Sequence, residues 1–192
     1  MESVGFKEWA IVCEALGRGE QSIILRKGGI AEGREGFTFR HAEFFLFPTY
    51  FHEQIEKTRT VGRAIPPQRE GEIEIGLFAK VERAVLVASW ETALALEPWH
   101  IWQREVVQER FEYEGAEGIH VALVRVFRLS RPWILPDLPA YGGCRSWVKL
   151  PPLPEGMKFV AVLSDEEHSQ RRESLEAILA PGEVASERAV AR

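Results

Sequence analysis

Apolar residues at helical spacing begin the chain, and a continuous apolar run follows them. Over residues 6–16, large apolar side chains recur every three or four positions, which is typical of one face of an α-helix. Residues 23–25, Ile-Ile-Leu, are apolar throughout, as in a strand that is buried on both faces. The pattern therefore predicts a helix over residues 6–16, with Trp9 buried, and then a strand that ends at Arg26.

Further strands and helices are indicated by the same two periodicities. Alternating or continuous apolar runs predict strands over residues 37–39, 43–47, 72–77, 84–88 and 119–129. Helical spacing predicts helices over residues 90–97 and 99–111, interrupted at Pro98, and a short helix after Pro48. At 192 residues, these elements fit one domain, with or without an appendage.

The C-terminal part is expected to be such an appendage. A proline-rich stretch separates residues 1–154, the main domain, from residues 155–180, which we expect to add a strand and a helix. Ser164 and Glu167 have the spacing of a capping box, so the helix is predicted to begin there and to end at Leu179. Residues 181–192 have little apolar surface, and we expect them to be disordered.

Composition and charge narrow the class of protein. The chain is 45% hydrophobic and contains six tryptophans, which is enough for a substantial core. Its net charge of −5 disfavours general coating of nucleic acid or anionic membrane, while a local basic site stays open. Two distant cysteines and a start without a secretory signal lead us to expect reduced thiols and a cytoplasmic location. No apolar run has the length of a membrane span, so no membrane association is expected.

The end of the strand at residues 23–26 is the first candidate binding site. Arg26 and Lys27 are followed by Gly28 in a glycine-rich loop, so two cations lie beside unhindered backbone N–H groups. Such a combination suits a phosphate or a carboxylate. The alternative is a strand end whose charges reach solvent or pair with a glutamate, in which case Arg26 is structural.

Histidines and acidic residues gather in one other stretch, at His41, Glu43, His52 and Glu53. A metal site needs a third convergent ligand at short spacing, which this stretch lacks, so we expect no metal. His41 or His52 is a candidate general acid or base, and a structural histidine is the alternative for each. No phosphate-loop or dinucleotide motif is present, and we expect no cofactor.

Aromatic residues offer a second kind of contact. Tryptophans stack on bases in single-strand and RNA sites, but more often they pack in a core. Trp102 has helical core spacing and is assigned to packing. Trp147, beside Arg145 after two glycines, is the better ligand candidate, and Arg40 next to His41 adds a further cation.

The order of these segments resembles the ASCH families of PUA-like barrels. Their GxKxxExR signature follows a helix, and Gly19 and Arg26 have the matching spacing, while Gln21 and Ile24 replace the lysine and the glutamate. Leu-Ser-Arg-Pro at residues 129–132 resembles the turn after the closing strand of those domains. The resemblance implies an α+β fold, a mixed and mostly antiparallel PUA-like β-barrel with peripheral helices and a C-terminal helix.

The chain also resembles an uncharacterised bacterial family, the domain of unknown function DUF1802. The shared features are Leu-Arg-Lys-Gly-Gly at residues 25–29 and Leu-Phe-Pro-Thr at residues 46–49. This resemblance brings no known activity. Some ASCH relatives are amidohydrolases of modified nucleosides whose chemistry uses the motif lysine. An amide such as Gln21 does not titrate and Ile24 has no carboxylate, so the residues weigh against an enzyme.

Together, these observations predict a module that binds RNA or a nucleotide-like ligand. The predicted ligand contacts are, in chain order, Arg26, Lys27, Gly28, Arg40, His41, His52, Arg145 and Trp147. The alternative is a small hydrolase of a modified nucleoside or amide, with a histidine as base. A protein-binding scaffold that uses its C-terminal helix is a third possibility. The sequence gives no oligomeric state.

Overall fold

The structure is a computed structural model that describes six stretches of the chain. These are residues 3–27, 37–60, 64–113, 118–143, 145–180 and 184–186. The expected ligand contact Gly28 and the second cysteine, Cys144, lie outside the described residues. Among the described residues, no helix has both the length and the apolar character that a membrane crossing requires.

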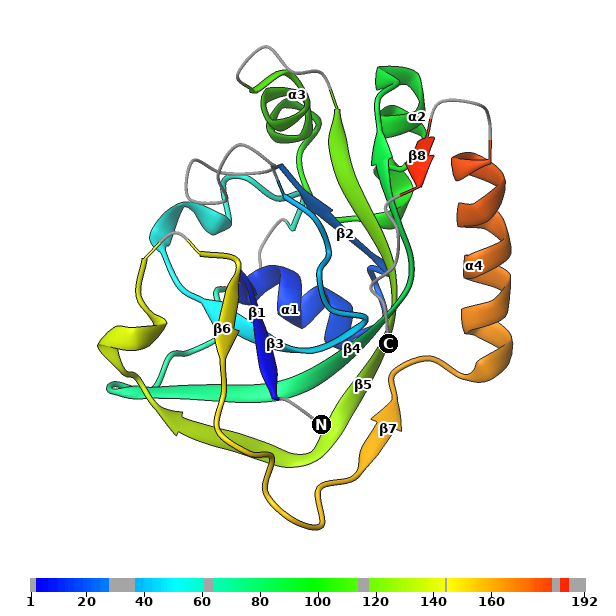
Figure 1. The fold of residues 1–192 in the computed structure, drawn as a ribbon. Coiled ribbons are helices and arrows are strands. Elements are labelled where there is room, and N and C mark those ends of the chain that lie inside the picture. The colour runs from blue at the N-terminus through cyan, green and yellow to red at the C-terminus, as the bar shows by residue number, and fades with distance from the viewer. Residues whose placement is uncertain are drawn as a thin grey trace.

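One curved sheet forms the body of the molecule (Figure 1). Its strands are β1 (Val4–Trp9), β2 (Ile23–Arg26), β3 (Glu43–Thr49), β4 (Glu72–Val87), β5 (Ile119–Pro136), β6 (Trp147–Lys149), β7 (Phe159–Ala161) and β8 (Val184–Ser186). The order is β2-β5-β4-β3-β1-β6, with β7 on β5 and β8 on β4. The β1–β3 pair is parallel and the other described pairs are antiparallel, so the sheet is mixed but mostly antiparallel.

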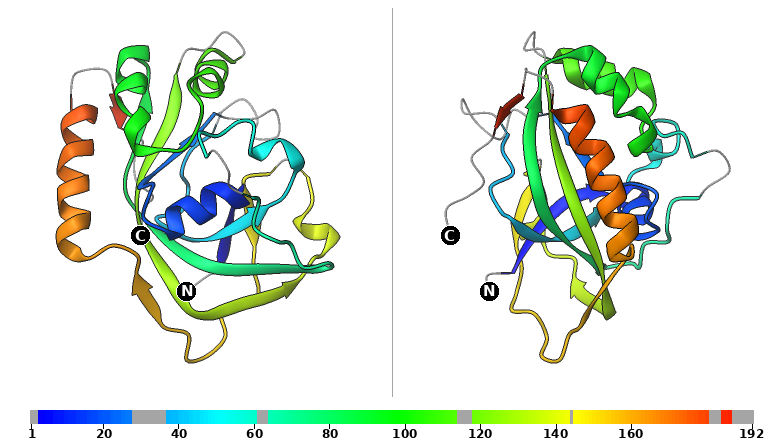
Figure 2. Two further views of the ribbon diagram at one scale, coloured as in Figure 1. Left: turned by 180° about the vertical axis from the view of Figure 1, so that it is seen from behind. Right: turned by 90° about the vertical axis from the view of Figure 1, so that its right-hand side faces the viewer.

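Helices and short turns complete the chain. The α-helices are α1 (Ala10–Gly17), α2 (Trp90–Ala95), α3 (Arg104–Glu112) and α4 (Asp165–Leu179). The 3₁₀ turns are η2 (His52–Gln54), η3 (Glu97–Trp99) and η5 (Pro139–Tyr141). Figure 2 shows α4 running along the two long strands β4 and β5, with α2 and α3 at one end of the molecule. The expected α+β fold with a mixed, mostly antiparallel sheet and a C-terminal helix is confirmed, and α2, α3 and α4 are peripheral as expected.

The first helix is shorter than the apolar spacing predicts. Residues 6–9 belong to β1, where Phe6 pairs with Leu46 and Trp9 with Thr49 of β3. The prediction of a helix over residues 6–16 is therefore wrong for its first turn, because strand pairing overrides local spacing. The remaining helix, α1, is buried at every position except Glu14, so it is an interior helix rather than an outer one. Trp9 is half-buried.

Other boundaries differ where the sheet extends a strand. Residues 72–77 and 84–88 lie largely in one long strand, β4, which carries two register shifts against β5. Strand β5 continues past Leu129 to Pro136 because its second half pairs with the start of β4. The expected strand at residues 37–39 is not a strand, although Phe37 and Phe39 are buried. The helix expected from residue 99 begins at Arg104.

The predicted C-terminal helix is confirmed and joins the main core. Ser164 caps α4, and Ser164 and Glu167 bond each other's backbone N–H groups in a capping box. Leu175 and Leu179 are buried in the same core cluster as α1 and β5. The expectation of a disordered tail is wrong for Val184–Ser186, which pair with Val85–Val87 of β4 as strand β8.

One side chain, Arg26, links the two ends of the sheet. Strands β2 and β6 end the strand order, so backbone pairing leaves the sheet open within the described residues. Arg26 at the end of β2 donates to the Lys7 carbonyl on β1 and to the Ser146 hydroxyl just before β6, both at 3.3 Å. Arg26 thereby links the two ends of the curved sheet and lies where three chain segments meet: the end of β2, β1 and the segment before β6.

Candidate functional site

A buried carboxylate lies at the centre of this junction. Strand alternation puts Glu8 on the same side of β1 as Phe6, facing the interior. The Glu8 side chain is only 1% exposed, and its Oε1 accepts from the Trp9 backbone N–H at 2.8 Å. Oε2 is buried without a hydrogen-bond partner. Burial raises the pKa of Glu8, while Arg26, the Trp9 N–H and Arg110 act in the opposite direction.

Arg26 is the first cation at this carboxylate. Its Nη1 lies 3.9 Å from Glu8 Oε1, and its guanidinium lies 5.2 Å from the centre of the Phe6 ring. The Arg26 side chain is 21% exposed, so it reaches solvent while its other donors hold Lys7 and Ser146. This is the glutamate pairing that the sequence left open as the structural alternative. A ligand role for Arg26 stays a prediction.

Arg110 of α3 is the second cation. Its guanidinium lies 3.8 Å from the centre of the Trp102 ring and 5.2 Å from that of Trp9. Burial lowers the pKa of Arg110 to about 10, Glu8 acts to raise it, and Arg26 lowers it further. Within the described part of the chain, the Arg110 side chain makes no hydrogen bond or ion pair. The rings therefore hold the guanidinium in place, and its N–H donors have no acceptor among the residues that the structure describes.

Aromatic rings extend from both sides of the charged groups. On the Arg110 side, Trp9 lies 4.4 Å from Trp102 and 4.4 Å from the half-exposed Phe51, both edge-on. On the Arg26 side, Phe6 lies 4.8 Å from Trp147. His41 lies edge-on to Trp147, also at 4.8 Å. These rings and charged groups together form what we call the arginine–aromatic site: Glu8, Arg26, Arg110, Phe6, Trp9, Phe51, Trp102, Trp147 and His41.

The charge of the arginine–aromatic site is positive. Two guanidinium groups face one carboxylate, and the raised pKa of Glu8 shifts the balance further toward positive charge. Arginine presents planar, forked donors to phosphate or carboxylate oxygens, and aromatic rings offer faces to planar bases. The chemistry of this site therefore fits an anionic ligand with a planar group.

The structure brings some of the predicted contacts together and separates others. Arg26, His41 and Trp147 belong to one contact series through Phe6. Lys27 donates to the carbonyls of Phe111 and Gly118 at 3.2 and 2.9 Å, so its ammonium links α3 to the start of β5. Arg40 and Arg145 are exposed next to His41 and Ser146. His52 is the first residue of η2, close in sequence to Phe51.

Sequence reasoning missed Glu8 and Arg110 and assigned Trp102 to packing alone. Trp102 is indeed 1% exposed, but its ring also supports the Arg110 guanidinium. Glu8 carried one signal, since it is a carboxylate directly before a long apolar run, Trp9 to Cys13. Arg110 carried none, because only the fold brings α3 to β1. The positions that depart from the ASCH signature are structural: Gln21 bonds the backbones of Ile23 and Ile101, and Ile24 is fully buried.

Comparisons with known proteins give a family and a distant structural likeness. The ASCH protein of Zymomonas mobilis has 15% identity, a TM-score of 0.43 and coverage of 91% of this chain and 95% of that chain. Two point mutants of the same protein give 14% and 15% identity, TM-scores of 0.44 and 0.41, and cover 99% and 96% of those chains. No curated protein matches the sequence. Residues 5–174 match the family described as "Domain of unknown function (DUF1802)", and the chain therefore belongs to that family.

Proposed function

We propose that the protein is a binding module for a nucleotide unit presented by single-stranded RNA. The observation that carries the proposal is the pair of guanidinium groups, Arg26 and Arg110, set around the buried Glu8 among aromatic rings. Arg110 supplies forked donors for a phosphate, and the partly exposed Trp9, Phe51 and Trp147 supply rings for bases. The expectation of a cytoplasmic location stays a prediction.

The net charge of the chain supports a local rather than a general contact. A protein with a charge of −5 does not attract RNA over its whole surface. Binding then depends on the few cations that face the ligand, which makes it sensitive to single substitutions. Arg110 is the most informative position to substitute, because within the described residues its guanidinium donates no hydrogen bond that the substitution would remove.

The test is a fluorescence anisotropy titration of a short, labelled single-stranded RNA. Arg110→Gln keeps much of the stem but removes the charge, and it should weaken binding by about ten- to a hundredfold, the scale of a charged hydrogen bond. Arg172→Gln on α4, which pairs only with Glu176 in the described chain, is the matched control and should bind as the wild type does. Thermal melting of both variants checks that the fold is retained.

Two outcomes would overturn this proposal. One is wild-type protein that binds no single-stranded RNA at low salt, and the other is equal binding by Arg110→Gln and wild type. A free nucleotide and a nucleotide unit of RNA offer the same phosphate and base. Titration with nucleoside monophosphates distinguishes between these two ligands. Tight binding of the free nucleotide, with no gain from RNA, would assign the site to a small ligand instead.

A hydrolase of a modified nucleoside or amide is the second candidate. The observation in its favour is Glu8, a buried carboxyl with a raised pKa and an unpartnered oxygen, which is a frequent property of general acids and bases. Incubation with amide-modified nucleosides, followed by chromatography, tests it. Turnover that is lost in Glu8→Gln would favour the hydrolase, and absence of turnover across the panel would remove it.

A further inference from the structure

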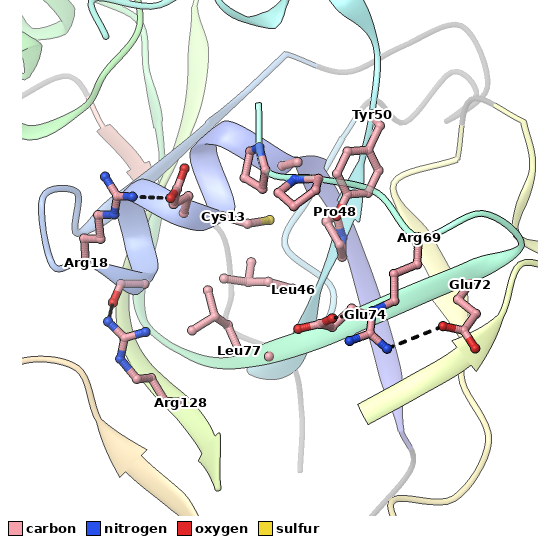
Figure 3. A pocket seen from close by; sticks show the side chains of 16 residues that line it. Cys13, Arg18, Leu46, Pro48, Tyr50, Arg69, Glu72, Glu74, Leu77 and Arg128 are labelled. Carbon is pink, nitrogen blue, oxygen red and sulfur yellow. Dashed lines mark hydrogen bonds and ion pairs between the residues drawn. The ribbon is translucent and has the colours of Figure 1, made fainter. Parts of the chain in front are cut away.

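A cavity lies on another part of the molecule, between α1 and the start of β4 (Figure 3). Its volume is about 460 Å³, which is within the range of small-molecule sites. Residues of α1, β3, β4, β5 and the proline-rich segment before β4 line it, and none of Glu8, Arg26 and Arg110 is among them. The cavity is therefore distinct from the arginine–aromatic site.

The middle of this cavity is apolar and open because of an irregularity in the sheet. Leu46 of β3 and Leu77 of β4 lie at its centre in Figure 3. Ile75 pairs with Trp133, but Leu77 pairs with Arg128, so β5 bulges opposite Gly76. A Cβ placed on Gly76 meets no atom within 4 Å, so the glycine leaves empty space at the cavity wall.

One end of the cavity carries an excess of positive charge. Arg128 donates to the carbonyl of Gly17, the last residue of α1, and has no carboxylate partner among the described residues. Arg18 at the same end is paired with Glu14. Glu14 therefore balances the charge of Arg18. The charge of Arg128 is not balanced by a described carboxylate, and most of its N–H donors have no described acceptor. An anionic group on a ligand would complete the contacts of Arg128.

The other end carries an excess of negative charge. Arg69 lies between two carboxylates, 3.7 Å from Glu72 and 3.6 Å from Glu74. One cation thus faces two carboxylates, and the side chains of Glu72 and Glu74 are 44% and 41% exposed. Figure 3 shows these three residues on the side of Leu46 and Leu77 opposite to Arg18 and Arg128. An ammonium group would balance this end.

We propose that the cavity binds a small zwitterion with a carboxylate and an ammonium group at opposite ends of an aliphatic body. The carboxylate contacts Arg128, the aliphatic body packs on Leu46 and Leu77, and the ammonium lies beside Glu74. Charge at both ends makes the site selective for length, because a body of the wrong length satisfies only one end. This proposal is independent of RNA binding, since the two sites share no side chain named here.

The test is calorimetric titration with ω-amino carboxylates of increasing chain length. One length should bind best, and the alkyl carboxylate and the alkylamine of that length should each bind about tenfold more weakly, because each loses a charged contact. Gly76→Leu places a side chain in the empty space and should abolish binding while the melting temperature is retained. Arg172→Gln, remote on α4, should leave binding unchanged.

Charge variants keep the test decisive if Gly76→Leu does not fold. Arg128→Gln should reduce the preference for the amino acid over the alkylamine, and Glu74→Gln should reduce its preference over the alkyl carboxylate. The proposal is overturned if no chain length binds. It is equally overturned if binding occurs but is unaffected by the Gly76 and charge variants, since the ligand then lies elsewhere.

Discussion

At the scale of single residues, the molecule keeps a carboxyl group and two guanidinium groups largely out of water. Removing charges from water costs several kcal/mol per ion, and a partner recovers that cost only in good geometry. The 3.9 Å separation of Arg26 and Glu8 is loose, and Glu8 Oε2 has no partner. The arrangement is therefore poorly optimised for stability, which is typical of residues kept for function.

Substitution of Arg26 tests the structural role that the sequence left open for this residue. Arg26→Ala leaves Glu8 buried without its nearest cation, and we expect a loss of about 3–5 kcal/mol in the free energy of unfolding. Urea denaturation measures it. Adding Glu8→Gln in the same chain should restore part of the loss. An unchanged free energy of unfolding in Arg26→Ala would show that the pair contributes nothing to the fold.

His100 makes stability depend on pH. Burial lowers the pKa of His100 to about 4, and the ordinary value in the unfolded chain is 6.5. Between these values the unfolded state binds more protons, so stability should fall as the pH drops from about 6.5 to about 4. The full effect is on the order of 3 kcal/mol. Above pH 7, His100 should contribute no pH dependence.

The matched variant for this prediction is His100→Asn. Its amide oxygen can accept from the Trp102 N–H, as Nδ1 of His100 does at 3.1 Å, but it does not titrate. Denaturation curves at several pH values should show a flatter profile in the variant than in the wild type. Parallel profiles between pH 4 and pH 6.5 would assign the pH dependence to groups other than His100. The raised pKa of Glu8 acts in the opposite direction, because it favours the folded state as the pH falls.

At the scale of elements, the sequence predicts best those segments whose periodicity agrees with their packing. Strand β2, the core of β5 and the capped helix α4 follow from apolar runs and a capping box. The β1–α1 boundary does not, because Phe6 and Trp9 fit helical spacing but pair with β3. Helical spacing has no information about a strand partner that lies some forty residues further along.

The candidate site shows the same limit more sharply. Arg26, His41 and Trp147 could be proposed from the sequence because cations and rings stand beside glycines or in short polar stretches. Arg110 and Glu8 could not be paired, since they are distant in sequence and approach each other only when α3 packs against Trp9 at the end of β1. Contacts of this kind can be found only once the fold is known, whereas the chemistry of each side chain can be read from the sequence.

Helix α4 tests whether the C-terminal part is an appendage or part of the core. Leu175 is fully buried and belongs to the main core cluster. Leu175→Ala should therefore lower the free energy of unfolding by about 2–5 kcal/mol, as for other buried leucines. The exposed Glu173→Ala is a control within the same helix. A change below about 0.5 kcal/mol for Leu175→Ala would show that α4 folds apart from the sheet.

At the scale of the whole molecule, a negatively charged chain has a positively charged site where the edges of its sheet meet. The overall charge of −5 keeps RNA from the general surface, so any binding must come from a small number of close cations. The salt dependence of the binding constant gives the number of such contacts. Each phosphate neutralised in a single strand adds about 0.7 to the magnitude of the slope of log K against log salt. A local site predicts a shallow slope.

The salt dependence of RNA binding is the measurement that tests the central claim most directly. Affinities of wild type and Arg110→Gln for single-stranded RNA are measured over a range of salt concentrations. We predict a shallow slope for the wild type and a slope smaller by about 0.7 for Arg110→Gln, which is one phosphate contact. Equal slopes for the two proteins, or no wild-type binding at the lowest salt, would contradict it.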